Sequence, residues 1–168
     1  FRRETFGDWF EARGPQVSER EATRKALVFA DTYNDHTTPE VAKAAVEVLE
    51  AAGVRVDVPD TGPSGRAAHS MGFLDTARER AERVVDDLLP RVQEGWDVVV
   101  VEPSDAVMFQ KDYRDLLSGP EVETFSGYAY GVCEYLDRHG LDAEVEWSPP
   151  RESLTYHGHC HQKATKKD

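Results

Sequence analysis

The sequence predicts an α/β fold: a Rossmann-like parallel sheet with helices on both faces. Short apolar segments of the strand type alternate with longer segments in which apolar residues recur at the spacing of a helix. One strand segment, 98–101, consists of four valines and has no polar face to expose to solvent. Strands that alternate with helices form βαβ units, and such units build a parallel sheet that is buried on both faces.

Four segments are expected to be strands. Residues 26–30 are all apolar and end at Asp31, as a strand buried on both faces does. Residues 54–58 alternate apolar and polar positions, which is typical of a strand nearer an edge. The valine segment 98–101 should lie at the centre of the sheet, and residues 154–156 should form a short last strand.

Helices are expected around these strands. Thr38 and Pro39 provide an N-cap and a first-turn proline for a helix that Gly53 ends. A long helix keeps one apolar face over 74–92, and Pro90 should kink or end it. The other helix candidates are 108–117, 128–139 and a short amphipathic helix within 1–24.

Length and charge limit what the chain can be. Its 168 residues suit one domain, which we place at 25–168 after an N-terminal helix and linker over 1–24. The formal net charge of -12 argues against nucleic acid as a partner, because phosphates would be repelled. Such a surface is typical of proteins from a high-salt cytoplasm, and equally of ordinary acidic cytosolic proteins. Without a secretory signal or a long apolar segment, we expect a cytoplasmic location, in solution or at the inner face of the membrane.

The segment 157–161 is the densest group of metal-binding side chain types. These side chains are His157, His159, Cys160 and His161. Imidazole and thiolate suit zinc or iron, but neighbouring strand residues point to opposite sides, so at most two of the four could bind one ion. The alternative is that they satisfy a tight turn by hydrogen bonding. Residues in other loops that could complete a metal site are His36, His69 and Asp105.

Three other features have a functional and a structural interpretation. The glycine-rich loop 61–66 could hold a phosphate with Arg66, but it matches no Walker A or G-x-G-x-x-G motif, and a structural turn is commoner. Glu102 and Asp105 could bind a hard cation or act in acid-base chemistry, or could be solvated loop acids. Cys133 is expected to be a buried residue on the apolar face of a helix.

Four segments occur in the order of landmarks of a known family. They are 28–33, 65–75, 101–105 and 155–164. In these segments the chain resembles the cysteine-rich CCG domain. That domain occurs in heterodisulfide reductases, in anaerobic glycerol-3-phosphate dehydrogenases, and in the iron-sulfur part of FAD-linked lactate and glycolate oxidases. The resemblance extends from Lys25 to the end of the chain, and segments 65–75 and 155–164 are its most specific parts.

The resemblance implies one half of a two-half CCG module whose first cluster motif is lost. The family has a cysteine after the first strand, a Cys-Cys pair in the second loop, and a CPSC or EPSC turn after the third strand. Proline cannot bind iron, and hydroxyl oxygens are poor substitutes for thiolates around a soft cluster. Cys160 aligns with the first cysteine of the second motif, whose Cys-Cys pair would follow residue 168. The residues at the first-motif positions are Thr32, Pro63, Ser64, Glu102 and Asp105.

The function implied is electron transfer within a flavin-linked, iron-sulfur 2-hydroxy-acid dehydrogenase of the D-lactate or glycolate type. The complete protein would contain FAD and an iron-sulfur cluster. Its other parts would be the second CCG half, a ferredoxin-like domain and an FAD-binding domain, and a quinone is an example of its acceptor. The chain begins at Phe1 and has no closing signal at its end, so we expect a piece that is not catalytic and binds no cluster alone.

Two alternatives to this interpretation remain. One is a flavodoxin-like module that binds an anion or nucleotide without redox chemistry, and the other is a zinc-binding domain. The residues at the crevice that could contact a cofactor are Arg66, His157, His159 and His161.

Overall fold

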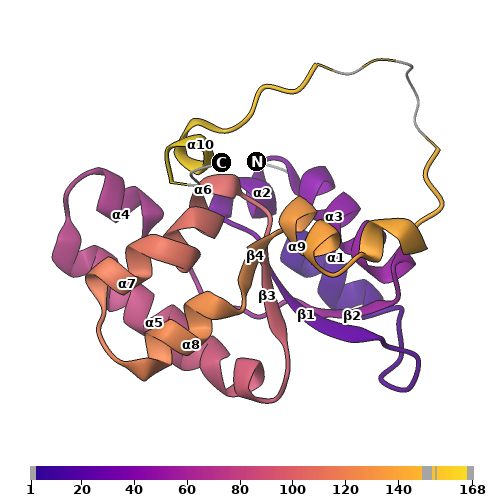
Figure 1. Cartoon of the computed structure of the whole chain (residues 1–168), viewed down its shortest axis with the longest axis horizontal. Coiled ribbons are helices and arrows are strands. Elements are labelled where there is room, and N and C mark those ends of the chain that lie inside the picture. Colours follow the sequence, from indigo (N-terminus) through magenta and orange to yellow (C-terminus); the bar gives the residue numbers. More distant parts are fainter. Residues whose placement is uncertain (1–2, 149–152, 154, 166–168) are drawn as a thin grey trace.

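The computed structural model describes residues 3–148, 153 and 155–165. At its centre is a four-stranded sheet in the order β2-β1-β3-β4, and every neighbouring pair of strands is parallel (Figure 1). The predicted α/β class and parallel sheet are therefore confirmed. The strands are β1 (Arg24–Phe29), β2 (Val54–Asp57), β3 (Asp97–Val100) and β4 (Ala129–Gly131).

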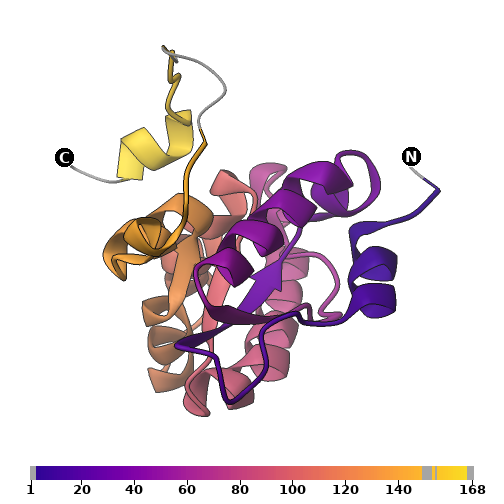
Figure 2. The same ribbon diagram turned by 90° about the vertical axis from the view of Figure 1, so that its right-hand side faces the viewer.

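Helices cover both faces of the sheet, as Figures 1 and 2 show. Helices α1, α3 and α9 lie on one side, and α5, α7 and α8 lie on the other. Their bounds are α1 (Phe6–Arg13), α2 (Thr32–His36), α3 (Pro39–Ala51), α4 (Arg66–Ser70), α5 (Leu74–Gln93), α6 (Pro103–Val107), α7 (Tyr113–Leu116), α8 (Pro120–Gly127), α9 (Val132–Arg138) and α10 (Cys160–Thr165). A π-helical turn, η1 (Met108–Asp112), joins α6 to α7, and a 3-10 turn, η2 (Leu141–Glu144), follows α9.

The hydrophobic core has two parts, one on each face of the sheet. Leu27 and Phe29 of β1 belong to the cluster under α5 and α8, whereas Ala26 and Val28 belong to the cluster under α1 and α3. This division follows from the strand geometry, because successive side chains point to opposite faces. All four residues of β3 are buried as well. Each inner strand therefore contributes apolar side chains to both core clusters.

The position of the strands agrees with their sequence patterns. The valine-rich strand β3 pairs with β1 on one side and β4 on the other, so it is an inner strand as predicted. The alternating strand β2 pairs with β1 alone and forms an edge of the sheet, as its half-polar pattern indicated. The N-terminal helix α1 also joins the core, because Phe6 and Phe10 are buried against the sheet face that α3 covers.

The fourth strand differs from the prediction. It lies at residues 129–131, inside the segment 128–139 that we expected to be helical throughout. Thr155 and Tyr156, expected in the last strand, have no regular structure, and Leu154 lies outside the described residues. A strand of three residues is shorter than the length over which a two-residue period can be recognised. Its apolar residues therefore merged with the pattern of α9.

The helices also differ from the predictions in their details. Helix α5 continues through Pro90 to Gln93, because a proline so close to the C-terminal end removes only one hydrogen bond near solvent. Thr38 is the N-cap residue of α3 and Pro39 lies in the first turn, as predicted, but the Thr38 hydroxyl donates to Asn34 Oδ1 at 3.3 Å and makes no capping hydrogen bond. The segment 108–117 is helical over 108–116, as predicted, but it consists of a π-helical turn followed by α7. Helix α8 was not predicted despite its N-terminal proline.

In the part of the chain that the structure describes, no helix is both long and apolar enough to cross a membrane.

Candidate functional site

The candidate site lies at the carboxyl edge of the sheet, where loops from three strands meet. Asp31 follows β1, Ser64 lies in the loop after β2, and Asp105 lies in α6 after β3. Ser64 and Asp105 are hydrogen bonded, and the charge of Asp31 acts on Asp105. Loops at this edge form the usual binding crevice of open α/β sheets. The chain order of the strands thus brings together three of the positions where the family resemblance implied cluster ligands or their neighbours.

Ser64 and Asp105 form a buried pair at the centre of this edge. Their exposed fractions are 5% and 3%. The backbone N–H of Arg66 donates to Ser64 Oγ at 3.1 Å, and the Ser64 hydroxyl donates its one hydrogen to Asp105 Oδ1. The buried Tyr113 hydroxyl donates to the Ser64 carbonyl oxygen at 2.7 Å. The Ser64 hydroxyl hydrogen, Oγ and carbonyl oxygen therefore each have a hydrogen-bonding partner within the protein.

Burial raises the pKa of Asp105 from its ordinary value of 3.8 to about 6. The hydrogen bond from Ser64 opposes this rise, the negative charges of Asp31 and Glu102 add to it, and the positive charge of Arg66 opposes it. A carboxyl group in this position changes its charge near neutral pH, whereas a solvated loop acid does so near pH 4. Burial likewise raises the pKa of Tyr113 well above its ordinary value.

Glu102 has a different role from Asp105. It is the N-cap of α6, and its Oε1 accepts hydrogen bonds from the backbone N–H of Ser104 at 3.3 Å and from the Ser104 hydroxyl at 2.9 Å. The two carboxyl groups that the sequence placed side by side therefore separate into a buried acid and a half-buried helix cap.

Arg66 is fully engaged by neighbouring side chains. Its Nη1 donates to Asp112 Oδ2 at 2.7 Å, its Nη2 lies 3.1 Å from His69 Nδ1, and its Nε donates to Ser70 at 3.2 Å. The loop after β1 is closed as well, since Asp31 accepts hydrogen bonds from the backbone N–H groups of Tyr33 and Asn34. The Asp31 carboxylate thus caps α2. Arg66, the residue predicted to hold a phosphate in loop 61–66, is paired with Asp112, which disfavours an anionic ligand at that loop.

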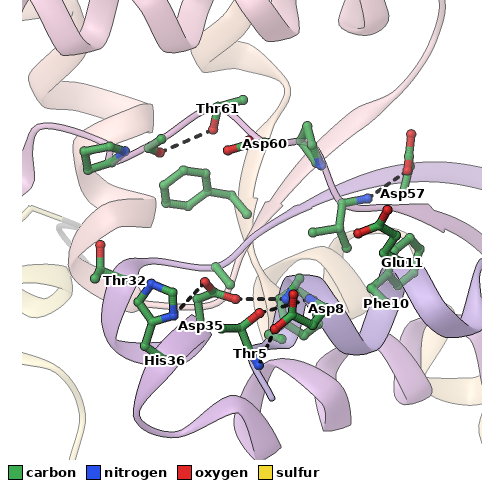
Figure 3. A pocket seen from close by; sticks show the side chains of 18 of the residues that line it. Thr5, Asp8, Phe10, Glu11, Thr32, Asp35, His36, Asp57, Asp60 and Thr61 are labelled. Carbon is green, nitrogen blue, oxygen red and sulfur yellow. Dashed lines mark hydrogen bonds and ion pairs between the residues drawn. The ribbon is translucent and has the colours of Figure 1, made fainter. Parts of the chain in front are cut away.

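Thr32 and Pro63, the other two first-motif positions, are exposed and line a pocket of about 840 Å³ (Figure 3). The pocket lies beside α1 at the carboxyl ends of β1 and β2. Asp35, one of its acids, accepts a hydrogen bond from the backbone N–H of Gly7 at 2.9 Å and pairs with His36 Nδ1 at 3.2 Å. The acidic lining repels anions as well. Its carboxylates are Asp8, Glu11, Asp35, Asp57 and Asp60.

The segment 157–161 lies over α6 and does not assemble a metal site with the other loops. His157, His159 and Cys160 line a smaller pocket of about 540 Å³ together with Glu102, and α10 contacts α6. Within residues 3–148, 153 and 155–165, no group of three or more His, Cys, Asp or Glu side chains is arranged to hold a metal ion. The three proposed additional ligands have other partners: His36 pairs with Asp35, His69 with Arg66, and Asp105 with Ser64.

The histidines of this segment differ in their surroundings. His157 is exposed, whereas His159 and His161 are half-buried. Burial lowers the pKa of His161, the charge of Asp112 opposes this, and the charge of Arg66 adds to it. His161 is therefore close enough to the Arg66–Asp112 ion pair to sense both charges.

Both cysteines are free and exposed. Cys160 is the first residue of α10, and the short strand expected before it is not found at Thr155 and Tyr156. The expectation for Cys133 was wrong, because this residue is not buried. Helix α9 begins only after Gly131, and this phase turns Tyr135 and Leu136 toward the core and Cys133 toward solvent. The helix that we had expected over 128–139 placed Cys133 on the apolar face instead.

Two residues of the site were missed by the sequence reasoning. Asp112 and Tyr113 reach the loop after β2 from η1 and α7, at a distance of 46 to 49 residues along the chain. Both residues are buried in the structure. The sequence signal for a polar network at this place was an acid beside a tyrosine next to an apolar helical pattern.

The fold and site therefore define an open α/β domain with a polar, self-bonded network at its carboxyl edge. No family model matches the chain, and no solved structure matches it. Its similarity lies with curated proteins. It is 24% identical over 144 residues to a D-2-hydroxyglutarate dehydrogenase of Escherichia coli K12, covering 86% of this chain and 14% of that protein.

A second group of similar proteins is shorter. The chain is 26% identical over 143 residues to lactate utilization protein A of Geobacillus kaustophilus, covering 82% of this chain and 57% of that protein. A homologue of the same name from Geobacillus thermodenitrificans is 25% identical over 143 residues. The chain thus spans a small part of the first kind of relative and just over half of the second.

Proposed function

We propose that the chain is the first half of a CCG module in a flavin-linked, iron-sulfur 2-hydroxy-acid dehydrogenase. The observation that carries this proposal is the similarity over 82% to 86% of the chain to proteins named for D-2-hydroxyglutarate and lactate. The parallel sheet and the meeting of the three loops at its carboxyl edge support it, because the family's motifs follow its strands in the same order.

The residues of the first motif do not fit an iron-sulfur cluster. Ser64 is hydrogen bonded to Asp105, the Pro63 side chain has no donor atom for a metal, and the Thr32 side chain is an exposed hydroxyl. This half is therefore not proposed to carry electrons. Its proposed role is to form one wall of the module, against which the second half and its cluster pack.

Cys160 is the one ligand that we propose for the cluster of the complete protein. It is exposed at the start of α10, and α10 lies against α6 at the carboxyl edge. A cysteine at an exposed edge can be reached by a cluster whose other ligands come from another part of the protein. The further ligands, the ferredoxin-like domain and the FAD-binding domain belong to this proposal and not to the described chain.

The reaction proposed for the whole protein is oxidation of a 2-hydroxy acid to the corresponding 2-oxo acid. FAD, when bound in its own domain, accepts the two electrons, and iron-sulfur centres pass them to an acceptor such as a quinone. No general base or nucleophile for this reaction is proposed within residues 1–168.

The test uses the gene product that contains this chain, purified without oxygen. We expect bound flavin and iron, and we expect the flavin to be bleached by at least one of D-lactate, glycolate and D-2-hydroxyglutarate. The L-enantiomers of lactate and 2-hydroxyglutarate serve as matched controls. A preparation with neither flavin nor iron, or one that no 2-hydroxy acid reduces, would contradict the proposal.

A further inference from the structure

The loop after β2 is held to the neighbouring segments by side chains. Ser64 donates to Asp105 of α6, Tyr113 of α7 donates to the Ser64 carbonyl oxygen at 2.7 Å, and Arg66 pairs with Asp112 of η1 at 2.7 Å. Ser64, Asp105, Asp112 and Tyr113 are all buried. Three separate contacts therefore join one loop to the segment that follows β3.

The loop also lies close to α5. Gly65 has a φ of 91°, in the left-handed region, and a Cβ atom at this position would lie 3.1 Å from the Ala77 carbonyl oxygen and 3.3 Å from Arg80 Cβ. Only glycine combines this backbone conformation with so close an approach. The loop is thus fixed between α5 on one side and the α6–α7 segment on the other.

The partner of the buried Asp105 is a hydroxyl group. A buried carboxyl group that lacks hydrogen bonds destabilises the folded state. Moving Ser64 away from Asp105 would leave this carboxyl group unpaired, so the pair helps to hold the loop in place. Because Ser64 Oγ also accepts the N–H of Arg66, the pair fixes the backbone at the start of α4 as well as its own two side chains. The network joins the loop after β2 to the segment after β3 with protein atoms alone.

We infer that the Ser64–Asp105 hydrogen bond, supported by Tyr113, is a metal-free tie that has replaced the cluster as the link between the loop after β2 and the helix after β3. That the tie has replaced a cluster rests on the proposed function, because the cluster ligands of the proposed family lie at these positions. The tie itself rests on the contacts. It follows that the loop after β2 and the segment after β3 stay joined whether or not iron is present.

Hydrogen exchange measured by mass spectrometry on the 168-residue chain tests the tie. We expect Ser64→Ala to raise the exchange of amides in residues 61–66 about tenfold, since one buried hydrogen bond contributes on the order of 1.4 kcal/mol. Asp105→Asn keeps an acceptor oxygen for Ser64 and should raise the exchange of these amides by less. Ser104→Ala removes a nearby hydroxyl that bonds Glu102 instead, and it serves as the matched control.

Tyr113→Phe provides a second variant, because it deletes one hydroxyl and keeps the aromatic packing. We expect faster exchange in the same residues from this change, so a failure of Ser64→Ala to fold leaves the inference testable. Equal exchange in Ser64→Ala and Ser104→Ala, with no change in Tyr113→Phe, would overturn it.

Iron distinguishes this inference from the proposed function. We expect the exchange of residues 61–66 in the wild-type chain to be the same with a chelator and after anaerobic addition of iron and sulfide. Protection that depends on iron would overturn the metal-free tie. The absence of flavin and iron from the complete gene product would contradict the proposed function and leave the tie intact.

Discussion

Arg24 Nη2 donates a hydrogen bond to Asp97 Oδ2 at 2.8 Å and so joins the first residue of β1 to the first residue of β3. The hydroxyl of Tyr135 donates to the same carboxylate oxygen at 3.1 Å. Asp97 is 3% exposed, whereas the Arg24 side chain is partly exposed. This network lies at the amino ends of the strands, opposite the candidate site, and is expected to serve stability rather than binding.

Asp97→Ala should lower the free energy of unfolding by about 2 to 4 kcal/mol, because the Arg24 guanidinium and the Tyr135 hydroxyl lose their buried partner. Denaturant unfolding at pH 7 measures the change. Asp86→Asn, at an exposed position of α5, is the control and should change stability by less than about 0.5 kcal/mol. Similar values for the two variants would mean that the network contributes little.

Asp105 should make stability depend on pH. The pKa of this carboxyl group has its ordinary value of 3.8 in the unfolded chain and is about 6 in the folded protein. The folded protein therefore binds the proton more tightly than the unfolded chain does. The contribution of protonated Asp105 to the free energy of unfolding is therefore fully present below pH 3.8 and is lost as the pH rises through about 6. The groups that act on this carboxyl are Ser64, Asp31, Glu102 and Arg66.

Asp105→Asn removes this titration. The free energy of unfolding of wild type minus that of the variant should fall by about 2 kcal/mol between pH 4.5 and 7.5, with burial accounting for most of the change. Unfolding curves of both proteins across this range measure it, and titrations common to both cancel in the difference. A difference that stays constant with pH would show that Asp105 is ionised throughout.

The chain was predictable where a local pattern decides the structure. The apolar segments of β1 and β3 indicated buried parallel strands, and the alternation in 54–58 indicated an edge strand, as observed. β4 was missed because three residues carry no periodicity of their own. The exposure of Cys133 depends on where α9 begins, and this is set by the strand before it.

The site was predictable in its location but not in its bonding. Strand order placed the loops with Ser64 and Asp105 at one edge, since the carboxyl ends of parallel strands meet there. The bond between them joins residues 41 positions apart, and the partners Asp112 and Tyr113 come from a π-helical turn and the helix after it. Contacts of this kind depend on tertiary packing, which single-sequence patterns do not encode.

The 168-residue chain should bind no stable [4Fe-4S] cluster after anaerobic treatment with iron and sulfide. A cluster usually takes about four thiolate ligands, whereas the sequence has two cysteines. Iron analysis after gel filtration and the absorption and paramagnetic resonance spectra measure the outcome. Stoichiometric iron with a cluster spectrum would contradict this prediction, and the complete gene product treated in parallel is the positive control.

The two cysteines should behave alike in this chain and differently in the complete protein. Both are exposed, so a thiol reagent should modify Cys133 and Cys160 in the native 168-residue chain. In the complete protein a cluster ligand is protected by its iron, and we expect only Cys133 to react before the cluster is removed. Modification of Cys160 at the same rate in both proteins would speak against its role as a ligand.

Replacing each cysteine by serine separates the two roles. Cys160→Ser in the complete protein should lower the iron content and the turnover with an electron acceptor, and it should leave reduction of the flavin by the 2-hydroxy acid largely intact, because that step belongs to another domain. Cys133→Ser should leave iron content and turnover unchanged and alter stability by less than about 0.5 kcal/mol, as expected for an exposed side chain. The two variants are compared for iron, flavin bleaching and acceptor-linked turnover in the same preparation. Equal behaviour, or a loss of iron in Cys133→Ser alone, would remove the reason for assigning the ligand to Cys160, since the two residues share their exposure and differ in their place at the carboxyl edge.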